Sequence, residues 1–234
     1  MASAGRSPRH RKRRSQAMRI GIIGAGFIGR AMAALAGKNG CEVMLSNSRG
    51  PHALASSAAS LGCEVGTVEQ AASFGDLVLL AVPFGRYPEL PVEAFAGKVV
   101  LDAGNYYPQR DGQLAALDSR QTTTSELLAQ HLVGARVVKA FNAILERDLV
   151  ADARPAGAAD RRALPIAGDD LQAKQAVSDL HERLGYDVVD AGALAEGRRF
   201  ERARPAYCRR LDSDGLRAAL ADEGPDQVEG SWRE

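Results

Sequence analysis

A glycine-rich loop constrains the fold of this chain more than any other feature of the sequence. Residues 18–23 are apolar enough to form a buried strand, and the loop 24–29, with the sequence GAGFIG, follows directly. Residues 30–38 predict a helix, and residues 42–45 predict a second strand. This order of strand, glycine loop, helix and strand is the pattern of a dinucleotide-binding site. The alternative is a tight turn that binds nothing.

Each loop glycine has a separate expected role. Gly24 permits the tight turn, Gly26 lets the backbone approach a pyrophosphate, and Gly29 lets the helix pack closely against the strand. The free N–H groups and partial positive charge of the helix N-terminus then favour the diphosphate.

The end of the second strand indicates which dinucleotide would bind. An acidic residue usually meets the ribose 2′-hydroxyl of NAD at this position, but here the chain reads Ser46-Asn47-Ser48-Arg49. The Ser48 hydroxyl and the Arg49 guanidinium can both donate hydrogen bonds to a phosphate. We therefore expect recognition of a 2′-phosphate, and hence NADP(H), against the alternative of a solvated turn.

Strand and helix patterns alternate along the rest of the chain. They predict an α/β fold with a Rossmann-type, doubly wound, mostly parallel sheet and a small C-terminal strand–helix–strand extension. We expect a basic disordered tail (1–17), a nucleotide-binding domain (18–142), an extension completing a second pocket (143–222) and a frayed end (223–234). Residues 152–162 read as a mobile loop.

Several local details can also be predicted. Thr67 and Gln70 have the form of a capping box, and Ser125 is the expected N-cap of a helix over residues 125–132. In the helix expected over residues 169–184, Leu171 belongs to the apolar face.

Charge and cysteine usage exclude several classes of function. The total charge is +1, but residues 1–17 contribute +6, so the remainder is acidic and gives no reason to expect nucleic-acid binding. The tail lacks the apolar stretch of a secretory signal, and Met18 could equally be the first residue. No apolar run approaches the ~20 residues of a membrane helix. Three scattered cysteines indicate a reducing, cytoplasmic setting and no metal site.

Six motifs together resemble those of the coenzyme F-420-dependent NADP oxidoreductases, from residue 18 to about residue 207. They lie at residues 24–29, 46–49, 80–83, 105–108, 138–142 and 190–194. The resemblance implies hydride transfer between NADPH and a deazaflavin, or a flavin-like acceptor, without a catalytic side chain. The same domain is similar to the NADPH-binding part of six-transmembrane prostate-antigen ferric reductases.

The resemblance places the acceptor where the loops around Pro83, Asn105, Asn142 and Gly192 converge. The expected partner is a small-molecule acceptor, with no nucleic acid or membrane, and a homodimer is left open. The predicted cofactor-binding residues are Gly24, Gly26, Phe27, Ile28, Gly29, Asn47, Ser48, Arg49, Ala81, Val82, Pro83, Asn105 and Asn142.

Some of these residues have simpler interpretations, and other functions remain open. Asn142 could only cap a turn, and Tyr106 and Tyr107 could only cover the sheet edge. Asp102 reads as a turn former, and Lys139 is expected to point away from the core. A non-catalytic NADPH-binding sensor is the main alternative function. An imine or hydroxyacid reductase is disfavoured because it needs a long helical second domain.

Overall fold

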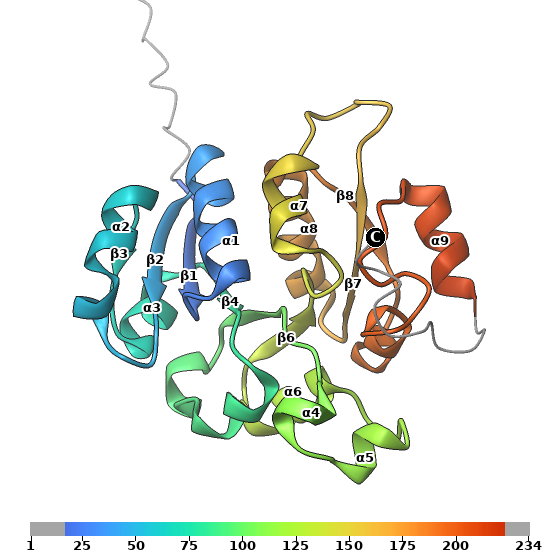
Figure 1. Ribbon diagram of the computed structural model, residues 1–234, viewed down its shortest axis with the longest axis horizontal. Helices are drawn as coiled ribbons and strands as arrows, with labels where there is room; N and C mark the ends of the chain where they lie inside the picture. Colours follow the sequence, from blue (N-terminus) through green and yellow to red (C-terminus); the bar gives the residue numbers. More distant parts are fainter. Residues whose placement is uncertain (1–16, 223–234) are drawn as a thin grey trace, which may run out of the picture.

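Eight strands form the central sheet of the computed structural model, which describes residues 17–222 (Figure 1). The strands are β1 Arg19–Ile23, β2 Glu42–Ser46, β3 Glu64–Val65, β4 Leu77–Leu80, β5 Val99–Asp102, β6 Arg136–Lys139, β7 Ala163–Gly168 and β8 Asp187–Asp190. Their order in the sheet is β3-β2-β1-β4-β5-β6-β7-β8. This order reverses on either side of β1, as in a doubly wound sheet.

All neighbouring strands run parallel except β6 and β7. That antiparallel pair is short, and its register matches Val138 with Gly168 and Lys139 with Ala167. The predicted Rossmann-type, mostly parallel fold is therefore confirmed. Among the described strands, those of the C-terminal extension pair with the rest of the sheet only at the carboxyl end of β6.

Helices cover both faces of the sheet (Figure 1). The α-helices are α1 Phe27–Lys38, α2 Ala55–Leu61, α3 Val68–Phe74, α4 Pro108–Asp111, α5 Ala115–Asp118, α6 Thr124–His131, α7 Glu146–Ala151, α8 Leu171–Leu184 and α9 Ser213–Ala221. The 3-10 helices are η1 Pro51–Leu54, η2 Phe84–Glu89, η3 Val92–Phe95 and η4 Leu194–Phe200.

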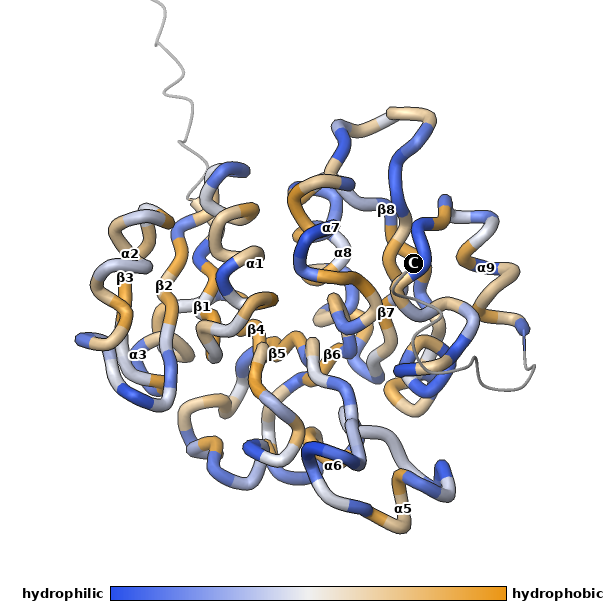
Figure 2. Tube along the Cα trace, in the orientation of Figure 1, coloured by the Kyte–Doolittle hydropathy of each residue, from blue (hydrophilic) through white to orange (hydrophobic). Residues whose placement is uncertain are grey.

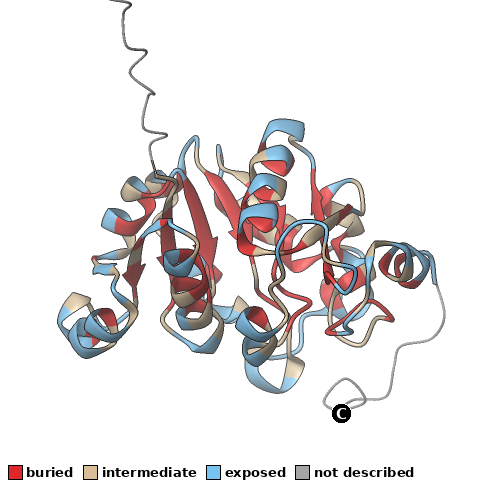
Figure 3. Cartoon of the chain, turned by 90° about the horizontal axis from the view of Figure 1, so that it is seen from above, coloured by how far each residue is buried: buried red, intermediate tan, exposed pale blue. Residues whose placement is uncertain are grey.

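The core divides into three apolar clusters that match these layers. The largest packs α1, α7 and α8 against one face, and a second packs α3, η3 and α6 against the other. A third lies between β7, η4 and α9. Figure 2 shows hydrophobic residues along the strands, and Figure 3 shows the strands buried while the outer faces of the helices are exposed. Such near-continuous apolar strands are typical of sheets covered on both faces.

Local capping explains where two of the helices begin. The capping box predicted at Thr67 and Gln70 is present at the start of α3. Helix α6 begins with a second capping box, formed by Thr123 and Glu126, so the prediction of Ser125 as N-cap is wrong. Ser125 is buried and donates through Oγ to Asp102 Oδ2 at 2.6 Å instead.

The C-terminal extension contains the predicted unit β7–α8–β8, with Gly185 in the left-handed conformation ending α8. Leu171 is 77% exposed, which corrects its assignment to the apolar face, because α8 begins there and only later turns meet the sheet. Residues 152–162 are largely irregular, yet Arg162 is fully buried and contacts Asp152 at 2.7 Å. Within residues 17–222, no helix is long and apolar enough to cross a bilayer.

Candidate functional site

The carboxyl ends of the central strands bring four loops to one edge of the sheet. Main-chain hydrogen bonds hold these loops in register: Gly24 N donates to Ser46 O at 3.0 Å, Ala81 N to Ile23 O at 2.8 Å, and Ala103 N to Leu80 O at 3.1 Å. In a doubly wound sheet, ligands bind at this edge where the strand order reverses. The reversal lies between β1 and β4, directly beside the glycine loop.

The three loop glycines differ in what surrounds them. Gly24 has φ of 108°, and a Cβ there would meet the Ala81 carbonyl group. A Cβ at Gly29 would collide with the Gly24 carbonyl oxygen, so both glycines are required by the fold. A Cβ at Gly26 would meet no protein atom within 4 Å. The space beside Gly26 is therefore free for a ligand.

One cavity, the glycine-loop cavity, has a volume of about 570 Å³ and runs from the loop to the end of β2. Its lining includes Gly24, Gly26, Asn47, Ser48, Arg49, Ala81, Val82, Pro83, Arg86, Glu89 and Leu90. Asn47 Oδ1 accepts a hydrogen bond from Arg49 N at 3.0 Å, which fixes the turn after β2. Asn47 Nδ2 is buried without a hydrogen-bond partner. A buried amide of this kind favours a ligand that can accept its hydrogen bond.

A second cavity, the tyrosine cavity, has a volume of about 710 Å³. Four residues line both cavities, namely Gly26, Ala81, Val82 and Pro83. Its other lining residues are Phe27, Ile28, Ala103, Gly104, Asn105, Tyr107, Gln109, Arg110 and Glu146. Phe27 is 82% exposed although it begins α1, and it presents an aromatic surface at this cavity. Apolar and aromatic walls with a few polar groups suit a flat organic ring.

The loop after β5 forms the rigid polar wall of the tyrosine cavity. Asp111 accepts hydrogen bonds from Tyr107 N at 3.0 Å and from Arg110 Nε at 2.8 Å. Burial opposes ionisation of Asp111, but these hydrogen bonds outweigh it and hold the pKa of its carboxyl below the ordinary value. Arg110 in turn donates to Asn105 O at 3.0 Å and lies over the Tyr107 ring at 4.8 Å.

A pair of amides joins this loop to the loop after β6. Asn105 Nδ2 donates to Asn142 O at 3.0 Å, and Asn142 Nδ2 donates to Asn105 Oδ1 at 3.2 Å and to Phe200 O at 3.0 Å. Phe141, which precedes Asn142, has φ of 60°, a left-handed conformation that is costly for a bulky residue. These contacts place Asn142 beneath Asn105 rather than in the lining of either cavity.

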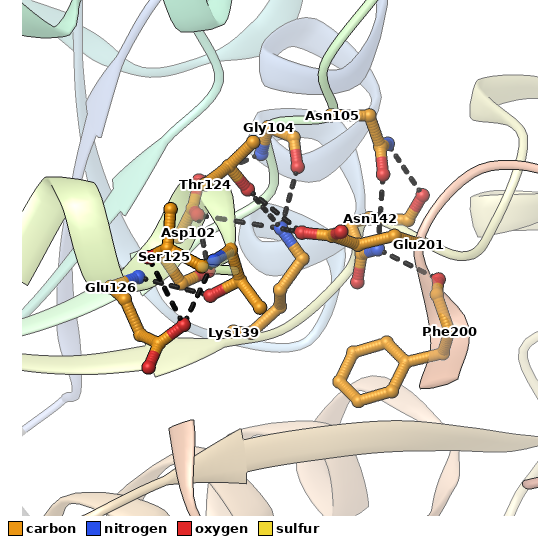
Figure 4. Close-up of polar contacts among 12 residues, drawn as sticks. Asp102, Gly104, Asn105, Thr124, Ser125, Glu126, Lys139, Asn142, Phe200 and Glu201 are labelled. Carbon is orange, nitrogen blue, oxygen red and sulfur yellow. Dashed lines mark hydrogen bonds and ion pairs between the residues drawn. The ribbon is translucent and has the colours of Figure 1, made fainter. Parts of the chain in front are cut away.

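A buried charged cluster lies below the same wall (Figure 4). Lys139 Nζ donates to Gly104 O at 2.9 Å and to Thr124 Oγ1 at 2.8 Å, and lies 3.5 Å from carboxylate oxygens of Asp102 and Glu201. The prediction that Lys139 points away from the core is therefore wrong, because its side chain is fully buried among these partners.

Asp102 is also fully buried and does more than form a turn. Its Oδ1 accepts from Gly104 N at 2.9 Å, as a turn-forming Asp would, and also from the Tyr87 hydroxyl. Burial and the charge of Asp102 raise the pKa of Tyr87 well above its ordinary value, so the phenol stays protonated and donates. Asp102 and Lys139 thus hold both the N–H and the C=O of Gly104.

The predicted site residues are largely brought together. All except Gly29 and Asn142 line one or both of these cavities, whereas Gly192 lies outside both linings. The sequence interpretation missed Arg86, Gln109, Arg110 and Glu146. The polar segment after Asp102 contains Pro108, Asp111 and Gly112, residue types that are typical of turns. This composition could have indicated a structured loop. Among the described residues, no three His, Cys, Asp or Glu side chains group closely enough to hold a metal ion.

Comparison with known proteins connects this arrangement to relatives. The model for the family described as NADP oxidoreductase, coenzyme F-420-dependent, matches residues 19–106. The solved structure of a hypothetical protein, SMa0349, from Sinorhizobium meliloti has 30% identity and a TM-score of 0.73, over 84% of this chain and 96% of that one. Residues 19–106 of the chain belong to the coenzyme F-420-dependent NADP oxidoreductase family.

Two further relatives of this chain have more specific descriptions. A structure from Arthrobacter sp. FB24, described as a candidate F-420-dependent NADP reductase, has 26% identity and a TM-score of 0.67, over 77% of this chain and 87% of that one. The metalloreductase STEAP3 of Rattus norvegicus is 32% identical over 188 residues, which cover 80% of this chain. The chain spans 36% of the length of that relative.

The glycine-loop cavity fits NADP, the cofactor named in the description of the matching family. No side chain caps the N-terminus of the twelve-residue helix α1, and its first turn contains no acidic residue. The open space at Gly26, the unpartnered amide of Asn47 and the cationic Arg49 lie along one cavity. These groups suit a diphosphate followed by a phosphorylated ribose.

Proposed function

We propose that this protein transfers a hydride between NADPH in the glycine-loop cavity and a deazaflavin or flavin-like acceptor in the tyrosine cavity. The observation that carries the proposal is that the two cavities are adjacent and have four lining residues in common, Gly26, Ala81, Val82 and Pro83. A dinucleotide that extends from Arg49 across Gly26 would end beside the space for a second ring.

The residues of the glycine-loop cavity have separate roles in this proposal. The N-terminus of α1 and the backbone at Gly26 hold the diphosphate, whereas Ser48 and Arg49 bind the 2′-phosphate. Ala81, Val82 and Pro83 form the apolar surface against which the nicotinamide lies. Their position in both cavity linings supports this assignment.

The protein positions the reactants and keeps water away from them. When bound, the nicotinamide and the acceptor ring supply the hydride chemistry themselves. Phe27, Ile28 and Tyr107 offer apolar surface, while Asn105 is held by Asn142 and Arg110. Precise placement of two reactants accounts for a large share of the rate in such reactions.

Isotopic labelling tests the proposal directly. NADPH carrying deuterium on either face of the nicotinamide would be mixed with a 5-deazaflavin in ordinary water, and the reduced acceptor analysed by mass spectrometry. We expect deuterium from one of the two labelled forms in the acceptor ring. Loss of the label to solvent would contradict direct transfer. The Gly26→Val variant serves as the control without bound cofactor.

The same experiment separates this function from a non-catalytic NADPH sensor. NADPH binding is measured independently by the fluorescence of the reduced nicotinamide. If NADPH binds but no deazaflavin, flavin or quinone is reduced, the sensor function replaces the oxidoreductase function.

A further inference from the structure

The 3-10 helix η2 contributes an ion pair to the lining of the glycine-loop cavity. Arg86 Nη2 lies 2.8 Å from Glu89 Oε2, and both residues line this cavity, as does Arg49. We propose that Arg86 is a second phosphate-binding residue, which exchanges Glu89 for a phosphate group when a dinucleotide binds. The inference rests on the proposed function, because it needs a dinucleotide in the glycine-loop cavity.

The pair between Arg86 and Glu89 holds the guanidinium only weakly. The two side chains are 53% and 55% exposed, and they are three residues apart on a short helix. An exposed ion pair of this kind contributes little, because water screens the charges and two long side chains must be ordered. The guanidinium of Arg86 can therefore leave Glu89 for a partner that binds it more strongly.

Arg110, in the adjacent tyrosine cavity, shows what a fixed arginine looks like in this protein. Its Nε and Nη2 donate to the two carboxylate oxygens of Asp111, each at 2.8 Å, and Nη2 also donates to Asn105 O at 3.0 Å. The Asp111 side chain is almost fully buried. Arg86 has no comparable set of contacts: among the described residues, its guanidinium makes only the ion pair with Glu89.

The backbone of η2 is fixed, so the exchange needs only side-chain rotation. Tyr87 is buried, and its hydroxyl donates to Asp102. Arg86 N donates to Pro83 O at 2.9 Å, and Leu90 N donates to Tyr87 O at 3.1 Å. The Arg86 and Glu89 side chains are thus mobile groups on a rigid support.

The order of the strands directs Arg86 and Arg49 toward the same ligand. Strands β2 and β4 flank β1, so their carboxyl ends lie roughly 10 Å apart with the glycine loop between them. Arg49 follows β2, and Arg86 follows β4. Guanidinium groups bind phosphate oxygens through paired, charge-assisted hydrogen bonds. The ligand of Arg86 is therefore a phosphate of the dinucleotide, either the 2′-phosphate or the diphosphate.

Four proteins test the exchange: the wild type, Arg86→Gln, Glu89→Gln and the double variant. NADPH binding to each full chain is measured by fluorescence titration, so turnover is not needed. Arg86→Gln should weaken binding by roughly 3- to 30-fold, because a phosphate contact is lost and Glu89 remains as a repelling charge. Glu89→Gln should tighten binding by roughly 2- to 5-fold, because the phosphate no longer competes with a carboxylate for Arg86.

The double variant separates an exchanging pair from a permanent one. If Arg86 binds phosphate, the double variant should bind NADPH more weakly than the wild type, but more tightly than Arg86→Gln. If Arg86 instead stays on Glu89 in the complex, removing both charges removes a neutral pair. Equal NADPH affinity of the double variant and the wild type would therefore overturn the proposal, as would unchanged or weaker binding by Glu89→Gln.

Helix α9 offers a matched control, and NADH identifies the phosphate. Asp214 and Arg217 form a pair with the same spacing, at 2.9 Å, and both are exposed and outside the cavity. Asp214→Asn and Arg217→Gln should leave NADPH binding unchanged; shifts equal to those at η2 would reduce the effect to total charge and overturn the exchange. Shifts seen with NADPH but not NADH assign Arg86 to the 2′-phosphate, whereas equal shifts with both assign it to the diphosphate.

The outcomes for this inference and for the proposed function are independent. If NADPH reduces a deazaflavin in the wild type but the four affinities do not follow the expected order, the exchange fails while the oxidoreductase function stands. If the affinities follow that order but no acceptor is reduced, Arg86 remains a phosphate-binding residue and the oxidoreductase function fails.

Discussion

Lys139 Nζ donates to the carbonyl oxygen of Gly104 at 2.9 Å, although the two residues are 35 positions apart and the lysine is fully buried. Gly104 belongs to the wall of the tyrosine cavity. A buried cation therefore fixes the carbonyl group of Gly104 from below, while Asp102 accepts a hydrogen bond from the N–H group of the same residue.

Replacing this lysine tests whether it acts on stability or on proton transfer. Lys139→Met leaves the buried Asp102 without its cation, and breaking such a pair typically costs roughly 3–5 kcal/mol of the free energy of unfolding. Urea unfolding measures the loss, with the exposed Lys38→Met as control. The hydride-transfer rate of the folded variant should fall by less than the ~10²–10⁴-fold typical of a lost general acid or base. A larger fall at unchanged stability would make Lys139 a proton donor.

Gly26 and Gly29 should respond differently to the same substitution. Gly26→Val should abolish binding of NADPH and NADH with little change in melting temperature, because a Cβ there meets no protein atom. Gly29→Val should lower the melting temperature markedly, since its Cβ would strike the Gly24 carbonyl oxygen. Calorimetry and cofactor titration measure the two effects. Normal NADPH binding by Gly26→Val would show that the loop is only a turn.

Arg49 should decide between the two nicotinamide cofactors. Charge-assisted hydrogen bonds contribute roughly 1.5–3 kcal/mol, so Arg49→Ala should weaken NADPH binding by roughly 10- to 150-fold. NADH lacks the phosphate and should bind almost unchanged. Arg217→Ala, remote from the cavity, controls for the loss of one positive charge. Equal losses for both cofactors would contradict phosphate recognition at the end of β2.

His181 should make the fold sensitive to acid. Its ring stacks on Phe141 at 4.0 Å and its Nδ1 lies 2.8 Å from Val177 O. Burial lowers the pKa of His181 to about 4, below the ordinary 6.5 of the unfolded chain. As the pH falls below about 6.5, the unfolded chain therefore takes up a proton first, and stability is lost until about pH 4.

Comparison with a neutral variant isolates this contribution. Between pH 7 and pH 4 the wild type should lose roughly 3 kcal/mol more of its free energy of unfolding than His181→Gln, which cannot take up the proton. Urea unfolding at several pH values gives both curves. Parallel curves would mean that His181 titrates alike in the folded and unfolded chains.

Features that depend on neighbours in the sequence could be predicted, whereas those that depend on distant partners could not. The glycine loop and the capping box at Thr67 follow from short patterns, and the structure contains both. The same rule identifies Thr123, because Glu126 stands three residues after it, although Ser125 was the predicted cap. The short helices α7 and α9 lack a long apolar repeat, and the sequence interpretation did not assign them.

Burial of Lys139 could not be predicted because it depends on partners from three separate elements. Thr124 begins α6, Glu201 follows η4, and Asp102 ends β5. A lysine near a strand end is usually exposed, and only tertiary packing shows otherwise. Tyr107 and Arg110 are similar, since a polar loop in the sequence does not reveal which side chains face a cavity.

The three glycines of the loop should tolerate substitution differently, depending on whether folding or cofactor binding is selected. In a library randomised at all three positions, a screen for folded protein would retain glycine at positions 24 and 29 and tolerate many residues at position 26, because only there does a side chain find open space. A screen for cofactor retention would add position 26 to the invariant set. Position 26 would therefore differ between the two screens, because glycine is needed there for the ligand and not for the fold. This difference would locate the ligand without a structure of the complex.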